Sequence, residues 1–236
     1  MPNNYFEFKQ FIICQDRCSF KVGTDGVLLG AAAGCEDRGK ILDIGTGSGL
    51  IAIMMAQKSK AEITAIEPDR ESFQQALENV ENCRWKDRIR VLETDLQHFS
   101  EKNGTFDLIV TNPPFFSNSL TNPDQRKSYA RHNFSLSTTD LLDGVQRLMT
   151  EEGSFQLIMP RVEGNILIAE ASSYGLYCNS ILKIRPLPTS EIKRLILTFS
   201  RFRLPVEEKF LTIEHGRRHD FTKEYKALTM DFYLKF

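Results

Sequence analysis

Three glycines and two carboxylates lie close together in the chain, at a spacing that can bind a nucleoside cofactor. Gly45, Gly47 and Gly49 follow a short apolar run. They can form a sharp turn that a ligand approaches closely, because no Cβ stands in the way. Asp43 precedes this turn, and Glu67 lies about 20 residues beyond it. A carboxylate in the latter position can accept hydrogen bonds from both ribose hydroxyls of an adenosine, so the stretch predicts an adenosine-cofactor site.

The glycine spacing narrows the choice of cofactor. Dinucleotide enzymes carry G-x-G-x-x-G, whose third glycine lets the helix pack on the strand, whereas this chain has G-x-G-x-G. The carboxylate of Asp43 would repel a pyrophosphate but could hold an ammonium group. The run DIGTGSG resembles the first motif of class I S-adenosylmethionine methyltransferases. Together with the carboxylates, this makes five residues candidate cofactor contacts: Asp43, Gly45, Thr46, Gly47 and Glu67. A tight turn that binds nothing is the alternative.

A second candidate site is Asn112-Pro113-Pro114-Phe115, at the end of a predicted central strand. Two prolines remove two backbone donors and fix φ, which makes a rigid corner with free carbonyl groups. If the Asn112 side-chain oxygen and the Pro113 carbonyl accept the two N–H bonds of a base amine, its lone pair points outwards. That nitrogen can then attack a methyl group in line, with the base stacked on Phe115. The alternative is an Asn-Pro turn that merely closes a strand.

Two further places offer candidate cofactor contacts. The segment KVGTDG should open a helix over 27–33, with Thr24 or Asp25 as its N-cap. Free N–H groups at such a helix end can bind a carboxylate, so Lys21, Thr24 and Asp25 are candidates, although a cap with no ligand weighs equally. Asp95 follows another predicted strand and could bind an adenine amine, or could cap a helix instead.

Short apolar strands alternate with helices, which predicts an α/β class I methyltransferase (Rossmann-like) fold. We expect a seven-stranded, mostly parallel sheet with one antiparallel strand and helices on both faces. The link 186–193 is too short for a parallel crossover, so the strands that flank it should pair antiparallel. An apolar stripe on the helix expected over 68–82 should face the core. The strands are expected at 41–44, 62–66, 88–92, 106–110, 154–159, 178–185 and 194–201, with a possible edge strand at 210–213 and a hairpin within 6–14.

Composition sets the broad class of the protein. A chain of 236 residues is long enough for one methyltransferase domain, here with a short N-terminal extension (about 1–20) and a closing helix over 223–233. The net charge of −1 gives no bulk sign of a nucleic-acid partner, although basic residues outnumber acidic ones beyond Lys183. Five scattered cysteines fit a reducing compartment. We expect a cytoplasmic protein, because no secretory or membrane-spanning segment is visible. We expect no metal, because neither the pair Cys14 and Cys18 nor the pair His215 and His219 has a second pair at zinc spacing. A monomer is also expected.

The Asn-Pro-Pro-Phe run carries a wider resemblance. It matches the [DNS]-P-P-[YFW] motif of amino-methyltransferases, which act on adenine N6, guanine N2, cytosine N4 or a glutamine amide. The chain also resembles the bacterial tRNA(Val)-specific adenine N6-methyltransferases over nearly its whole length, through FKQF, DRC, KVGTDGVLLG, LDIGTGSGL, ALT and FYL. This implies transfer of a methyl group from S-adenosylmethionine to the adenosine 3′ of the anticodon. It also places Asp43, Gly45, Glu67 and Asp95 on cofactor-contact positions. Phe115 stands where tyrosine is usual.

The RNA contacts are predicted more weakly. Residues 116–139 show no apolar periodicity, and a loop this long in a compact domain is usually functional or disordered. Basic and aromatic side chains alternate there beside the catalytic corner, where they could bind phosphates and steady a flipped base. A solvated loop weighs equally. The candidate RNA contacts are Arg126, Lys127, Arg131 and His132, with Arg217 and Arg218 near the C-terminus.

Other functions remain open from the sequence. A guanine N2-methyltransferase of ribosomal RNA would use the same motifs. A protein glutamine methyltransferase would normally carry a helical domain before the glycine turn, where only 40 residues are available. A nicotinamide oxidoreductase lacks support from the glycine spacing. A non-catalytic RNA-binding module would need Asp43 or Asn112 to be lost, and both are present.

Overall fold

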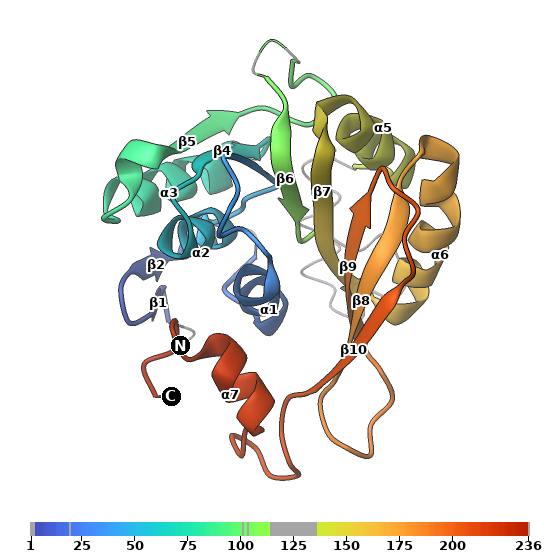
Figure 1. The fold of residues 1–236 in the computed structure, drawn as a ribbon. Coiled ribbons are helices and arrows are strands. Elements are labelled where there is room, and N and C mark those ends of the chain that lie inside the picture. Colours follow the sequence, from blue (N-terminus) through green and yellow to red (C-terminus); the bar gives the residue numbers. More distant parts are fainter. Residues whose placement is uncertain (1–2, 19, 101, 103, 114–135, 236) are drawn as a thin grey trace.

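A computed structural model describes residues 3–18, 20–100, 102, 104–113 and 136–235 of the chain. The described residues form one large sheet with helices on both of its faces (Figure 1). In spatial order the strands of this sheet are β10 (Glu207–Thr212), β8 (Tyr177–Arg185), β9 (Arg194–Ser200), β7 (Met149–Pro160), β6 (Phe106–Thr111), β3 (Lys40–Ile44), β4 (Glu62–Glu67) and β5 (Ile89–Glu93).

The strand directions agree with the predicted fold class. β3 pairs parallel with β4 and β6, while β9 runs antiparallel to both β7 and β8. The sheet has eight strands instead of seven, because the possible edge strand forms. It begins at Glu207, three residues earlier than expected, and pairs parallel with β8. The carboxyl ends of β3, β4 and β6 therefore meet at one edge of the sheet.

The helices form two layers around a sheet whose central strands are apolar on both faces. One layer holds α1 (Thr24–Ala32), α2 (Leu50–Lys58), α3 (Arg70–Glu81) and α7 (Lys223–Thr229), and the other holds α5 (Thr138–Leu148) and α6 (Arg161–Ala171). On β3, Ile41 belongs to the first core cluster and Leu42 to the second, and both are fully buried. Burial on both sides is what a near-continuous apolar strand predicts.

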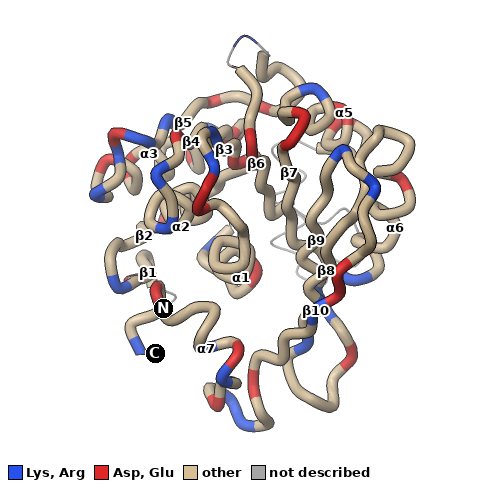
Figure 2. The backbone as a smooth tube through the Cα atoms, in the orientation of Figure 1, with Lys and Arg blue, Asp and Glu red and all other residues tan. Residues whose placement is uncertain are grey.

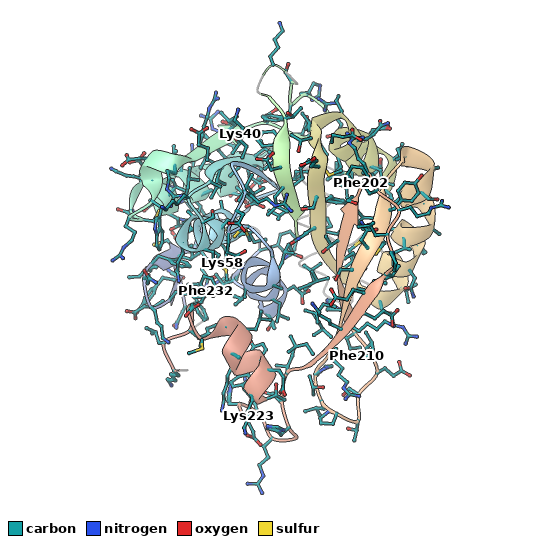
Figure 3. The ribbon with its side chains drawn as sticks, viewed as in Figure 1. Lys40, Lys58, Phe202, Phe210, Lys223 and Phe232 are labelled. Carbon is teal, nitrogen blue, oxygen red and sulfur yellow. The ribbon has the colours of Figure 1, made fainter. Side chains whose placement is uncertain are left out.

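The two ends of the described chain pack against each other (Figure 1). The predicted N-terminal hairpin is present as β1 (Tyr5–Glu7) and β2 (Ile12–Cys14). The Lys9 backbone N–H donates to the carbonyl oxygen of Phe232 over 2.8 Å. Phe232 itself is buried just beyond α7 (Figure 3). The predicted closing helix thus covers the hairpin side of the core, and it ends sooner than expected.

Two local expectations are wrong. Helix α1 begins at Thr24 with Gly23 as its N-cap, and no side chain caps it. The apolar stripe expected on the helix over 68–82 includes Leu77, which is 41% exposed on α3, because polar residues on the neighbouring face of the helix are buried instead. Those buried polar residues are Ser72, Gln75 and Asn79.

Within the described chain no helix is long and apolar enough to span a membrane. Two short 3-10 helices complete the described elements, η1 (Lys86–Arg88) and η3 (Ser172–Tyr174).

Candidate functional site

The glycine turn connects β3 to α2 in left-handed backbone conformations. Gly45, Gly47 and Gly49 have φ angles of +67°, +57° and +82°, which side chains with a Cβ rarely adopt. Their surroundings differ. A Cβ on Gly49 would lie 3.5 Å from the backbone of Ala76 on α3, whereas a Cβ on either of the other two would meet no described atom within 4 Å. Gly49 therefore serves helix packing, and the first two glycines leave the backbone open to a ligand.

Asp43 is a fully buried carboxylate at the end of β3. Its Oδ2 accepts hydrogen bonds from Thr46 Oγ1 at 2.6 Å and from the Ala52 backbone N–H at 3.2 Å. Its Oδ1 is buried and has no hydrogen-bond partner among the described residues. Burial raises the pKa of this carboxyl to about 6, against the lowering effect of its two hydrogen bonds. An unsatisfied buried carboxylate oxygen is costly, so this atom is suited to a cationic or N–H donor from a ligand.

Glu67 ends β4 and reaches the glycine turn. Its Oε2 accepts from the Gly47 backbone N–H at 2.8 Å, and its Oε1 from the Asp69 backbone N–H at 3.0 Å. The two strand ends are also joined by the carbonyl of Ile66, which accepts from the N–H groups of Gly45 and Thr46. Glu67 is buried, with 8% of its surface exposed, and this burial raises the pKa of its carboxyl to about 7. Its free lone pairs remain able to accept from a ligand's hydroxyl groups.

The raised pKa of Glu67 predicts how stability depends on pH without ligand. Between its unfolded pKa of 4.5 and its folded pKa of about 7, the folded protein binds more protons than the unfolded chain. Stability therefore falls as pH rises through this window, by about 3 kcal/mol for this group, and levels off above it. Glu67→Gln removes this contribution. The unfolding free energy of the wild type minus that of the variant should fall by about this amount between pH 4 and 8.

Urea unfolding at several pH values measures this difference. Asp43 and the other titrating groups are present in both proteins, so the difference reports Glu67 together with its electrostatic coupling to Asp43 and Asp69. The amide also replaces one of the two oxygens that accept from the Gly47 and Asp69 N–H groups, which lowers the stability of the variant as a whole. A difference that stays constant from pH 4 to 8 would show that Glu67 keeps an ordinary carboxyl pKa.

Asn112 directly follows β6, beside the glycine turn. The Thr111 hydroxyl donates to the carbonyl of Ile44 at 2.8 Å, which joins the ends of β6 and β3. The Asn112 side chain extends toward the first turn of α1, since its Nδ2 lies 3.9 Å from where a Cβ on Gly26 would stand. Its Oδ1 is buried without a described partner. Pro113 is buried, while Pro114 and Phe115 lie outside the described residues. The edge thus presents two unpartnered buried oxygens, on Asp43 and Asn112.

The first turn of α1 lies beside Asn112, but its residues make other contacts than the predicted helix cap. Asp25 does not cap the helix; its carboxylate accepts from Arg194 Nε of β9 at 2.8 Å. Thr24 is exposed, and the Lys21 ammonium donates to the carbonyl of Asn3 at 3.4 Å. A Cβ added at Gly26 would lie 3.2 Å from the Leu50 side chain, so α1 packs closely on the start of α2. Cofactor contacts from Lys21, Thr24 and Asp25 remain a prediction.

Asp95 caps a turn and not a helix, which was the alternative that the sequence left open. Its carboxylate accepts from the backbone N–H of His98 at 2.8 Å and lies 2.7 Å from the imidazole Nδ1. It is nevertheless close to the site, because the adjacent Thr94 N–H donates to the carbonyl of Glu67 at 3.2 Å. A role for Asp95 in binding adenine remains a prediction.

Most candidate RNA contacts fall outside the described residues: Arg126, Lys127, Arg131 and His132. Arg217 and Arg218 are exposed in the loop between β10 and α7, where basic and acidic residues are interspersed (Figure 2). In the described ranges, no group of three His, Cys, Asp or Glu side chains could hold a metal ion.

Three buried amides near the site were missed in the sequence. Gln15, Gln75 and Asn79 are each less than 10% exposed and hydrogen-bond to backbone groups of other segments. The pattern considered on α3 was its apolar stripe. The overlooked signal is that residues 75 and 79 are four positions apart, which places both amides on one face of the helix.

Comparison with known proteins identifies the family. Residues 23–159 match the family model of the methyltransferase small domain. The chain is 44% identical over 237 residues to the tRNA1(Val) (adenine(37)-N6)-methyltransferase of Bacteroides thetaiotaomicron, with 99% of both chains covered. It is 42% identical over 240 residues to the enzyme of the same name from Trichodesmium erythraeum, with both chains fully covered. The chain belongs to this methyltransferase family.

Solved structures agree on the fold of the methyltransferase. A predicted O-methyltransferase from Agrobacterium tumefaciens has a TM-score of 0.65 at 23% identity, covering 88% of this chain and 96% of its own. The TYW2 of P. horikoshii, solved in complex with MeSAdo, has a TM-score of 0.57 at 15% identity, covering 83% of this chain and 69% of its own. The predicted class I methyltransferase fold is confirmed.

Proposed function

We propose that this methyltransferase transfers a methyl group from S-adenosylmethionine to N6 of adenine 37 in tRNA1(Val). The relatives that carry this activity in their names align with the whole chain at 42–44% identity. The structural observation that supports the reaction most directly is the buried, unpartnered Oδ1 of Asn112, at the same sheet edge as the glycine turn. An exocyclic amine of a base would supply the donor that this oxygen lacks.

The residues present fit S-adenosylmethionine. Backbone at Gly45 and Gly47 is open where a Cβ would stand. Asp43 offers an unpartnered carboxylate oxygen for the ammonium end of the cofactor, and Glu67 can accept from the ribose hydroxyls. When bound, the cofactor supplies an electrophilic methyl group. No metal is needed for this chemistry.

The chain's own contribution is to orient a poor nucleophile. The lone pair of an adenine amine is delocalised into the ring, so the nitrogen attacks weakly when it is planar. Hydrogen bonds from its two N–H groups to Asn112 Oδ1 and to the Pro113 carbonyl would make it pyramidal, with the lone pair directed outward. Holding it within about 3–3.5 Å of the methyl carbon allows in-line attack. The methylated ammonium then releases its proton to water, so no strong general base is required.

The proposed substrate must leave its stack to react. The amine of a stacked base cannot reach a buried methyl group, so adenine 37 would be flipped into the site. The resemblance assigns Phe115 the stacking surface, and Pro114 with Pro113 the rigid corner.

We further propose that the protein acts as a single-domain monomer in the cytoplasm, and that Arg217 and Arg218 are among its RNA contacts.

Methyl transfer to separated substrate fractions tests this function against its rivals. The protein would be incubated with labelled S-adenosylmethionine and with total tRNA, ribosomal RNA or protein, and the products digested and analysed by mass spectrometry. We expect N6-methyladenosine in tRNA. Label in guanosine of ribosomal RNA, or in protein glutamine, would favour the corresponding rival enzyme and overturn the proposed substrate.

A further inference from the structure

One buried side chain on α3 connects three separate segments at the cofactor site. Asn79 is 2% exposed. Its Nδ2 donates to the carbonyl oxygens of Cys14 and Ser48, both at 2.8 Å, and its Oδ1 accepts from the Cys14 backbone N–H at 2.9 Å. Ser48 belongs to the glycine turn, and Cys14 ends β2. A single amide thus fixes the turn and the N-terminal segment relative to each other.

The same face of α3 holds the residues that follow β2. The Oε1 of Gln75, a fully buried side chain, accepts from the Arg17 backbone N–H at 3.1 Å. The Arg17 guanidinium forms an ion pair with Glu78. Residues 75, 78 and 79 are spaced so that they share one helix face. This face therefore binds backbone as well as side chain of residues 14–17.

The segment that α3 holds borders the proposed cofactor site. Through the Asn79 amide, the backbone of Cys14 is joined to the Ser48 carbonyl of the glycine turn. The chain then continues into α1, whose first turn approaches Asn112. The segment between β2 and α1 is therefore linked to the glycine turn through Asn79 at one end, and leads at the other end into the helix that approaches Asn112.

We propose that Asn79 is a positioning residue for S-adenosylmethionine, which it serves without touching it, by holding the glycine turn and the N-terminal segment in their binding arrangement. This inference rests on the proposed function, because it assumes that the cofactor binds at the turn. Without the amide, the Ser48 carbonyl and both polar groups of Cys14 lose their partner. The two segments would then be ordered only on binding, which weakens affinity.

Asn79→Ala should raise the dissociation constant for S-adenosylmethionine at least about tenfold, while kcat at saturating cofactor changes less than about twofold. Asn79→Asp should be at least as damaging, because an acceptor oxygen would then face the carbonyls of Cys14 and Ser48. Asn82→Ala is the matched control. Asn82 is the C-cap of the same helix, and within the described chain its exposed amide donates only to the Glu78 carbonyl of α3. This variant should bind the cofactor as the wild type does.

Isothermal titration calorimetry measures the affinity, and amide hydrogen exchange at Cys14 and Arg17 reports on the held segment. We expect faster exchange at Cys14 in Asn79→Ala, with the exchange of central strands unchanged. If that variant does not fold, Gln75→Ala should show a smaller loss of affinity and faster exchange at Arg17. A variant that is less stable but binds the cofactor as tightly as the wild type would overturn the inference alone. A wild type that does not bind the cofactor would overturn the proposed function first.

Discussion

Asn112→Ala should lower kcat for methyl transfer by at least about 100-fold while the dissociation constant for S-adenosylmethionine stays within about twofold. Removal of one preorganised polar group at a reacting centre typically costs a factor of 10² to 10³. Asn112 should contact the acceptor base and not the cofactor, because its buried Oδ1 has no described protein partner and it follows the strand next to the turn. The loss should therefore appear in chemistry alone.

Asn112→Asp is the matched variant. It keeps an acceptor oxygen at the same place, and aspartate is allowed at this position in the [DNS]-P-P-[YFW] motif, so it should retain more activity than the alanine variant. Single-turnover rates and calorimetric cofactor binding separate the two effects. An equal loss of turnover and cofactor affinity in Asn112→Ala would contradict the assigned role.

Asp43→Asn should weaken the binding of S-adenosylmethionine about 10- to 150-fold, because a hydrogen bond to a charged group contributes about 1.5–3 kcal/mol. The free protein should not lose stability above pH 7. Burial raises the pKa of this carboxyl to about 6, which means that the folded protein keeps a charge there at a cost. The amide variant removes that charge and retains an acceptor for Thr46. Loss of affinity without loss of stability is the expected signature.

Thr46→Val is the control for Asp43. It removes the 2.6 Å hydrogen bond from the hydroxyl but leaves the carboxylate and its bond from Ala52 in place. Its effect on cofactor affinity should be smaller than that of Asp43→Asn. Equal binding by the wild type and Asp43→Asn would exclude a contact between this carboxylate and the cofactor.

The sheet could be predicted because its strands are recognisable from short stretches of the sequence. β3 and β4 are short, largely apolar strands, and each is followed by a helix. Parallel pairing then brings the carboxyl ends of β3, β4 and β6 together, so the proximity of Asp43, Glu67 and Asn112 follows from topology. The structure confirms this arrangement, while the chemical roles of these residues remain predictions.

What could not be predicted depends on partners distant in sequence. Asp25 looked like a helix cap, but its partner, Arg194, lies 169 residues away, and a glycine occupies the cap position instead. Gln75 and Asn79 were not predicted to have any role. They are buried because the N-terminal segment crosses their face of α3. Their spacing places them on one face of the helix, but it does not tell which segment covers that face. Phe115 and the predicted RNA contacts over 126–132 lie outside the described residues.

The most direct test of the function uses two unmodified transcripts of tRNA1(Val), one natural and one with guanosine in place of adenosine 37. Each would be incubated with the protein and labelled S-adenosylmethionine, and its nucleosides analysed by mass spectrometry. We predict N6-methyladenosine in the natural transcript and no methylation of the altered one. Equal methylation of both transcripts, or label in guanosine, would contradict the assignment of adenine 37 as the acceptor.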